Sequence, residues 1–191
     1  GPAAARAKAK ARAGAGAGAD ASRPVLLVLA GVNGAGKSSI GGNVMLRRLG
    51  LTWFNPDTYS RLLIEQVGLP LARANALAWQ HGLDLLDQAV AAGHSHAFET
   101  TLGGATMAQR IAAASSTHDV LVWFCGLSSA EQHIARVAKR VAAGGHAIPE
   151  PRIRERWIKA PLHLIEGLPH LHELRAFDNS VEARTGQAVK D

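Results

Sequence analysis

Short, unbroken apolar runs alternate with longer stretches of helical period between residues 24 and 180. The runs at 25–30 and 120–125 contain no charged residue, which is typical of strands buried on both faces of a parallel sheet. Weaker runs predict three more strands, at 52–54, 97–99 and 174–177.

Apolar positions three and four residues apart predict helices between these runs. The predicted helices are at 37–49, 58–67, 71–92, 104–115, 129–142, near 151–159 and near 161–173. In the helix at 71–92, the stripe expected to face the core consists of Leu77, Leu83, Leu86 and Val90. Strands that alternate with helices predict an α/β fold, a three-layer sandwich around a mostly parallel five-stranded sheet.

Residues 31–38, Gly-Val-Asn-Gly-Ala-Gly-Lys-Ser, match the phosphate-binding pattern G-x-x-x-x-G-K-[ST] between a predicted strand and a predicted helix. The glycines allow backbone N–H groups to face phosphate oxygens, and the Lys37 ammonium reaches the β- and γ-phosphates. The Ser38 hydroxyl is the expected Mg²⁺ ligand. The sequence therefore predicts a P-loop that binds ATP or GTP with Mg²⁺. The residues of this segment expected to contact the nucleotide are Gly31, Asn33, Gly34, Ala35, Gly36, Lys37, Ser38 and Ser39.

A P-loop alone does not distinguish a kinase from a GTPase or a mechanical ATPase. A GTPase would carry a guanine-reading Asn/Thr-Lys-x-Asp after a later strand, where this chain has Cys-Gly-Leu at 125–127. A motor would end an apolar strand in Asp or Asp-Glu, and the run at 120–125 does not. These differences favour a phosphotransferase that acts on the hydroxyl of a small molecule.

Polar residues follow the second and third predicted strands. Asp57, in the Asn-Pro-Asp segment at 55–57, stands where P-loop kinases position the group that accepts the substrate's proton. The alternative is that Asp57 is only the N-cap of the next helix. Glu99, Thr100 and Thr101 are expected to face a substrate beyond the carboxyl ends of the strands, the alternative being an exposed polar loop.

Basic residues flank the glycines at 144–145. They predict a hinged helical lid, at about 143–160, whose arginines close over the triphosphate and neutralise charge on the transferred group. The expected lid arginines are Arg136, Arg140, Arg154 and Arg156, and we expect Arg140 and one of the last two to act on phosphate. The alternative is a solvated helix face.

The net charge of +6 raises the question of a nucleic-acid partner. Residues 1–23 hold five basic residues against one acidic residue and are expected to form a flexible, basic Ala/Gly-rich leader, so the +2 that remains disfavours nucleic acid. No run of 18 apolar residues predicts a membrane span. The single cysteine, Cys125, excludes a disulfide framework and is compatible with a cytoplasmic protein. Residues 24–180 are the expected kinase domain, and 181–191 a polar tail.

With the P-loop, four later segments resemble the zeta toxin family, in particular its small stand-alone kinases, from about residue 25 to residue 180. These segments are 55–57, 98–102, the Gly-Gly-His-Ala-Ile-Pro run at 144–149 with the arginines after it, and 178–180. The resemblance implies that Asp57 is the catalytic base, that Glu99 and Thr100 contact the substrate and that Arg140 contacts phosphate. It also implies that Asn179 lies in the loop near the adenine.

The resemblance further implies a reaction and a partner. Zeta toxins phosphorylate a hydroxyl of UDP-N-acetylglucosamine with ATP or GTP and are restrained by a small antitoxin. Where the best-known members have a second lid arginine, this chain has His146, and Arg154 or Arg156 is the candidate to replace it. We therefore expect a cytoplasmic kinase of a nucleotide-sugar or another nucleotide-like substrate. A nucleotide-gated switch with slow hydrolysis and a polynucleotide kinase are the alternatives.

Overall fold

The computed structural model describes residues 22–40, 50–51 and 53–181. Its elements, in chain order, are β1 (Val25–Ala30), η1 (Lys37–Ser39), β2 (Trp53–Phe54), α2 (Pro56–Val67), α3 (Leu71–Ala92), β3 (His96–Thr100), α4 (Ala105–Ala114), β4 (Asp119–Gly126), α5 (Ala130–Ala142), α6 (Glu150–Gly167), η2 (Leu168–His170) and β5 (Glu173–Asp178). The leader and tail expected at 1–23 and 181–191 lie almost wholly outside the described residues.

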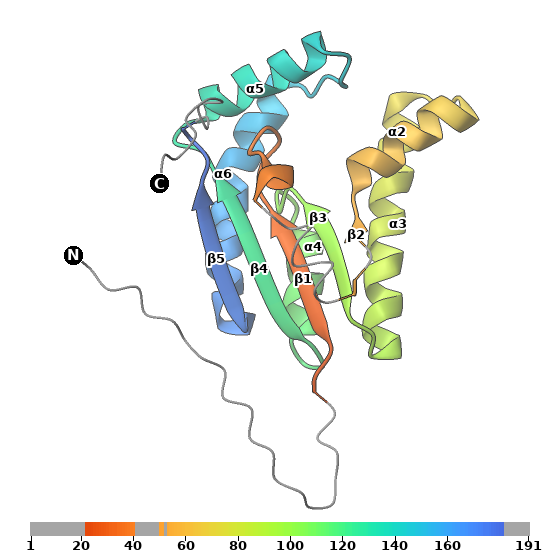
Figure 1. Ribbon diagram of the computed structural model, residues 1–191, viewed down its shortest axis with the longest axis vertical. Coiled ribbons are helices and arrows are strands. Elements are labelled where there is room, and N and C mark those ends of the chain that lie inside the picture. Colours follow the sequence, from red (N-terminus) through yellow and green to blue (C-terminus); the bar gives the residue numbers. More distant parts are fainter. Residues whose placement is uncertain (1–21, 41–49, 52, 182–191) are drawn as a thin grey trace, which may run out of the picture.

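The five strands form one parallel sheet in the order β2-β3-β1-β4-β5 (Figure 1). The first strand in the chain lies at the centre, where Leu27 is opposite Ala97 of β3 on one side and Leu121 of β4 on the other. Alternate residues of β1 belong to apolar clusters on the two faces of the sheet, which explains its unbroken apolar run. The α/β fold and the five-stranded sheet predicted from the sequence are confirmed.

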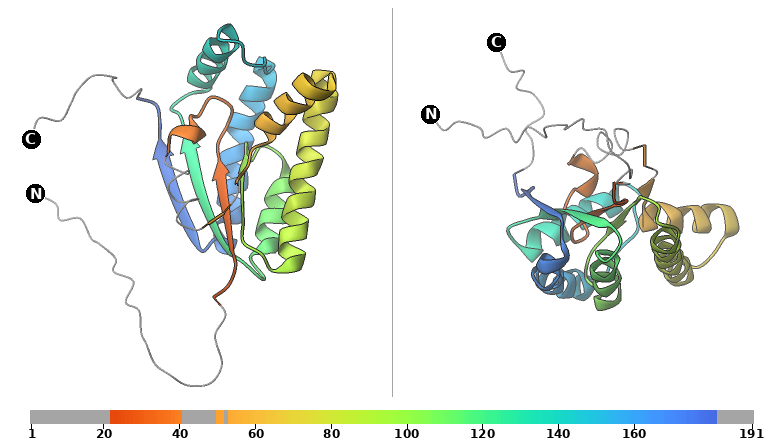
Figure 2. Two further views of the ribbon diagram at one scale, coloured as in Figure 1. Left: turned by 45° about the vertical axis from the view of Figure 1, so that its right-hand side comes forward. Right: turned by 90° about the horizontal axis from the view of Figure 1, so that it is seen from below.

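Helices α3, α4 and α6 lie side by side against one face of the sheet (Figure 2, right). Their inner faces and this face of the sheet bury the main core, to which the sheet contributes Leu26, Val28, Phe98, Val120 and Val122, and the helices Leu83, Leu86, Ile111 and Ile153. This core fixes the carboxyl ends of the strands relative to the helices that surround them.

The opposite face of the sheet is also apolar. Leu27, Leu29 and Trp123 form a second cluster there, and Ile40 and Leu51 pack against it. Only Lys37–Ser39 of the helix predicted at 37–49 is described, as the 3-10 helix η1, since residues 41–49 lie outside the described part of the chain. The helix that the three-layer prediction places on this face therefore falls on residues that the structure does not describe.

The sequence predicted two helices where α6 is one. Pro161 lies inside α6 and cannot donate a backbone hydrogen bond, which makes a proline in a helix interior costly. The helix continues because the main core includes Ile153 and Ala160 before the proline and Leu164 after it. Packing on both sides of Pro161 thus outweighs the tendency of proline to interrupt a helix.

The predicted core stripe of α3 was wrong at Leu77, whose surface is 41% exposed. Leu83 and Leu86 are buried as expected, and Val90 packs against the core. Six residues turn a helix by about 600°, which places Leu77 about 120° away from the direction of Leu83. Between residues 22 and 181, in the part that is described, no helix is long and apolar enough to span a membrane.

Candidate functional site

The P-loop leaves the carboxyl end of β1 and is confined by its neighbours. The Gly31 N–H donates to the Thr100 carbonyl at 3.1 Å. A Cβ on Gly31 would lie 2.5 Å from the Cys125 carbonyl oxygen, and one on Gly34 would lie 2.9 Å from the His133 carbonyl oxygen. Gly34 also has a φ of +83°, which an L side chain rarely adopts. Both positions therefore require glycine.

Side chains from distant elements hold the P-loop in place. The Asn33 carbonyl accepts a hydrogen bond from His133 Nδ1 of α5 at 2.8 Å. Asn179, which follows β5, donates through Nδ2 to the Ala35 carbonyl at 3.0 Å. Arg136 in turn donates to the Asn179 carbonyl at 2.6 Å. Asn179, predicted to lie near the nucleotide, and Arg136, predicted as a lid arginine, both hold the P-loop in the structure.

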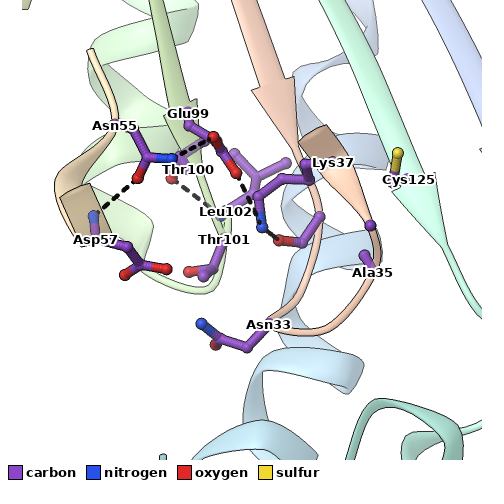
Figure 3. Close-up of polar contacts among 12 residues, drawn as sticks. Asn33, Ala35, Lys37, Asn55, Asp57, Glu99, Thr100, Thr101, Leu102 and Cys125 are labelled. Atoms are coloured by element: carbon purple, nitrogen blue, oxygen red, sulfur yellow. Dashed lines mark hydrogen bonds and ion pairs between the residues drawn. The ribbon is translucent and has the colours of Figure 1, made fainter. Parts of the chain in front are cut away.

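Lys37 points back into the loop that precedes it. Its ammonium donates to the Gly31 carbonyl at 2.7 Å and lies 3.7 Å from Glu99 Oε1 (Figure 3). Burial lowers the pKa of Lys37, and the Glu99 charge partly offsets this effect. Burial likewise raises the pKa of Glu99, with Lys37 acting in the opposite direction. The pair brings together two charges that are each costly to bury alone.

Asn55 connects this pair to the start of α2. Its Nδ2 donates to Glu99 Oε2 at 2.8 Å, and its Oδ1 accepts from the N–H of Asp57 at 2.9 Å and of Thr58 at 3.3 Å (Figure 3). Asn55 is therefore the N-cap of α2. The capping alternative for Asp57 is wrong, because Asp57 lies within the first turn and its carboxylate is not the cap.

Asp57 lines an open, solvent-filled hollow. Arg140 Nη1 of α5 lies 4.0 Å from Asp57 Oδ2, and the Asp57 side chain is 62% exposed. Arg61 and Asn75, from α2 and α3, line the same hollow, as does His146 from the connection between α5 and α6. The hollow is thus lined by one carboxylate, two arginines and part of the segment predicted as the lid.

The threonines after Glu99 use their hydroxyl oxygens locally. Thr100 Oγ1 accepts from the Leu102 N–H at 3.1 Å, and Thr101 Oγ1 accepts from the Gly103 N–H at 3.4 Å. Leu102 has a φ of +56°, and its carbonyl accepts from His163 Nδ1 at 2.8 Å. The loop is therefore held in a defined shape beside Glu99.

The two candidate arginines of α6 differ in position. Arg156 donates to Asn33 Oδ1 at 2.6 Å and covers Gly103, where an added Cβ would lie 2.6 Å from the arginine Cγ. Burial lowers the pKa of Arg156. Arg154 instead pairs with Glu131 and Glu150 at the surface. Of the two, Arg156 reaches the P-loop. The part of the predicted lid from residue 150 onward belongs to α6, whose Ile153 is in the core.

The sequence did not reveal the role of His133, Asn55 or the Arg156–Asn33 contact. The His133–Asn33 and Arg156–Asn33 pairs are 100 and 123 residues apart, so no local spacing reports them. The Asn55 role had a local indication, an amide directly before Pro56 at a helix start.

Ser38 is exposed at the start of η1, where a hydroxyl could reach a cation held by a bound triphosphate. The side chain of Ser39 lies outside the described part of the chain. Among the described residues, no three His, Cys, Asp or Glu side chains converge on a metal position.

No protein-family model matches the chain, and no curated protein matches it. A candidate kinase from Chloroflexus aurantiacus superposes with a TM-score of 0.61 at 16% identity, over 86% of this chain and 90% of its own. A chain of the PezAT chromosomal toxin-antitoxin system of Streptococcus pneumoniae gives a TM-score of 0.56 at 14% identity, over 83% of this chain and 69% of its own. A chain of the AvrRxo1-ORF1:AvrRxo1-ORF2 complex gives a TM-score of 0.62 at 18% identity, over 83% of this chain and 56% of its own.

The TM-scores of 0.56–0.62 establish a common fold, and at sequence identities of 14–18% they establish the fold alone. The AvrRxo1 complex has also been solved with ATP, and that structure matches with a TM-score of 0.61 at 19% identity, over 83% of this chain and 55% of its own. The chain therefore shares its α/β fold with the candidate kinase and with the chain of the PezAT system.

Proposed function

We propose that this chain is a kinase that transfers a phosphoryl group from ATP or GTP, with Mg²⁺, to a hydroxyl of a small molecule. The observation that carries the proposal is the continuous set of contacts from Lys37 through Glu99 and Asn55 to Asp57. These residues stand near the carboxyl ends of β1, β3 and β2, at the edge where open parallel sheets bind ligands.

The P-loop residues fit a nucleoside triphosphate. Gly31 and Gly34 let the loop pack directly against the backbone of Cys125 and His133. This packing supports a curled loop whose backbone N–H groups would face phosphate oxygens. Lys37 would exchange Glu99 for the β- and γ-phosphate oxygens, and Ser38 would be the protein ligand of Mg²⁺. A bound nucleotide with Mg²⁺ supplies the phosphoryl group and screens its charge.

Asp57 would accept the proton of the acceptor hydroxyl. Its position beside the open hollow gives a substrate access to the carboxylate, and Arg140 lies 4.0 Å away to orient it. Arg140 and Arg156 would stabilise charge on the transferred group from two sides, one from α5 and one from α6. Glu99 and the loop formed by Thr100 and Thr101 would contact the rest of the substrate.

A nucleotide-sugar such as UDP-N-acetylglucosamine is the acceptor that we propose, in a cytoplasmic reaction. Two of the structural neighbours belong to two-component assemblies, a toxin-antitoxin system and the ORF1:ORF2 complex. A small antitoxin protein is therefore the partner that we propose for this chain.

The test is mass spectrometry of nucleotide-sugars, other small hydroxyl compounds and RNA ends after incubation with the protein, ATP and Mg²⁺. We expect one acceptor to gain one phosphate. Asp57→Asn should lower the transfer rate at least about 100-fold with nucleotide affinity retained, because a positioned general base typically contributes about 10²–10⁴-fold. Lys37→Ala should lose nucleotide binding itself.

Asp84→Asn is the matched control, because Asp84 is an exposed carboxylate on α3 that bonds Gln80. It should transfer phosphate at the rate of the unaltered protein. Full activity in Asp57→Asn would remove Asp57 from the mechanism. Slow ATP hydrolysis that no acceptor in the panel stimulates would favour the nucleotide-gated switch, and phosphate gained only by RNA ends would favour a polynucleotide kinase.

A further inference from the structure

Asn55 is held in one orientation by its neighbours in the chain. The ring of Pro56 restricts the residue before it to an extended backbone, and Asn55 has a φ of −120° and a ψ of 113°. As the N-cap of α2, Asn55 accepts through Oδ1 from the N–H groups of Asp57 and Thr58. With the oxygen of its planar amide bound there, the nitrogen faces Glu99 (Figure 3). One side chain therefore fixes both the start of α2 and the position of a carboxylate.

The two oxygens of the Glu99 carboxylate have different partners. Oε2 accepts a hydrogen bond from Asn55 Nδ2 at 2.8 Å, whereas Oε1 lies 3.7 Å from the Lys37 ammonium. Lys37 donates its own hydrogen bond, of 2.7 Å, to the Gly31 carbonyl. Within the described part of the chain, no other side chain pairs with this carboxylate. Glu99 is thus held mainly by Asn55, and Lys37 is the partner that can leave.

Nucleotide binding, on which this inference rests as part of the proposed function, takes Lys37 away from Glu99. The carboxylate would then remain in a site where only 13% of its side chain is exposed. Burial raises the pKa of Glu99, the Lys37 charge opposes this effect and the Asp57 charge adds to it. A shielded charge that loses its last partner is strongly destabilising. The free energy of binding a triphosphate therefore depends on what still holds Glu99.

Asn55 is the partner that stays when the lysine leaves. Hydrogen bonds to a charged group are stronger than those between neutral groups, and the cap already orients this amide. We propose that Asn55 is a positioning residue for nucleotide binding, which holds the Glu99 carboxylate in place when Lys37 is released to the phosphates. This role requires an amide. Serine and aspartate cap a helix as well as asparagine does, but serine has only one polar side-chain atom and an ionised aspartate has no donor.

Isothermal titration calorimetry of the whole chain, with non-hydrolysable analogues of ATP and GTP and Mg²⁺, tests this role. Asn55→Ser keeps the cap oxygen and should weaken nucleotide binding by about tenfold or more, because the bound state loses a hydrogen bond to a charged group. Asn55→Asp should weaken binding further, since it places a second carboxylate beside Glu99. Gln80→Ala is the matched control, because Gln80 donates to the Asp84 carboxylate at the same 2.8 Å on the exposed surface of α3. It should bind nucleotide as the unaltered protein does.

A double-mutant cycle with Glu99→Gln separates this role from helix capping alone. Glu99→Gln leaves no charge behind when Lys37 binds phosphate, so adding Asn55→Ser to it should change the affinity less than about twofold. A cap acts on α2 whether or not position 99 is charged, so a loss caused by capping alone would be the same in both backgrounds. Circular dichroism identifies the folded variants, and either substitution at Asn55 suffices for the cycle.

The proposal is overturned if folded Asn55→Ser and Asn55→Asp bind nucleotide as tightly as the unaltered protein. It is also overturned if their loss of affinity is as large in the Glu99→Gln background. Either result would leave the proposed kinase activity intact. The proposed function itself fails, and this inference with it, if the unaltered protein binds neither nucleotide analogue.

Discussion

Lys37 and Glu99 form the most shielded ion pair among the described residues, with 11% and 13% of their side chains exposed. A buried charge left without a partner is strongly destabilising. Glu99 therefore compensates the charge of the lysine, and Asn55 holds the carboxylate in position at 2.8 Å. In the proposed function, a phosphate oxygen would take the place of Glu99 as the anionic partner of Lys37.

His133 makes stability depend on pH. Burial holds its pKa below the ordinary value of 6.5. As the pH falls through that value, the unfolded chain binds a proton that the folded protein does not, so folding stability is complete above it and decreases below it. We expect the free energy of unfolding to fall by up to about 1.4 kcal/mol per pH unit for this one group.

Urea denaturation at a series of pH values on both sides of 6.5 measures this dependence. His133→Gln should make the free energy of unfolding depend less steeply on pH, because it removes the buried imidazole. His96 contributes to the remaining slope, since burial lowers its pKa as well. If the free energy of unfolding of His133→Gln depended on pH as steeply as that of the unaltered protein, this histidine would not be the titrating group.

Single residues were predictable from the sequence where their role is local. The P-loop glycines and Lys37 are recognised by their spacing, because a phosphate cradle is built from consecutive backbone groups. The residues that hold this cradle, His133 and Asn179, reach it from α5 and from the end of β5. The sequence pointed to Asn179 only through family resemblance, and His133 had no local indication.

At the scale of elements, α6 directs Arg156 to the P-loop and Arg154 to the surface, a difference that the sequence did not reveal. Arg156→Ala should lower the transfer rate at least about 100-fold, because it removes a cation at the P-loop. Arg156→Lys keeps the charge but loses the planar guanidinium, and should recover only part of the rate. Arg154→Ala should keep nearly full activity, since Arg154 pairs with Glu131 and Glu150 at the surface.

Steady-state kinetics with the acceptor from the metabolite panel compares these variants. Because Arg156 also covers Gly103, each variant's melting temperature distinguishes lost packing from lost catalysis. Equal rates in Arg154→Ala and Arg156→Ala would contradict this assignment.

The elements themselves were largely predictable, and their ends less so. Apolar runs identified β1 and β4 because burial on both faces excludes charge. Pro161 misled the prediction because the local preference of proline is weaker than the packing of Ile153, Ala160 and Leu164. The start of α2 was also displaced, since Asn55 caps a helix that begins at Pro56.

At the scale of the whole molecule, two leucines of α3 test where the core lies. Leu86→Ala should lower the free energy of unfolding by about 2–5 kcal/mol, because it leaves a cavity between α3 and the sheet. Leu77→Ala should cost well under 1 kcal/mol, since its side chain is largely in solvent. Chemical denaturation monitored by circular dichroism gives both values, and similar losses would contradict the position of α3.

The α/β class of the molecule followed from alternating periodicity, but the order of the strands did not. Strand order depends on contacts such as Leu26 with His96 and Leu26 with Val120, which are about 70 and 94 residues apart. Those contacts depend on how complete faces of the sheet and helices fit together, which a local pattern does not encode.

The central position of β1 has a consequence for protein synthesis. The ribosome makes this strand before either of its neighbours, because β3 begins at His96 and β4 at Asp119. At about 5–20 residues per second, the apolar segment Val25–Ala30 waits several seconds for its first partner in the sheet. A nascent chain that pauses before residue 96 therefore exposes an apolar segment without a partner strand, which is the kind of segment that chaperones bind.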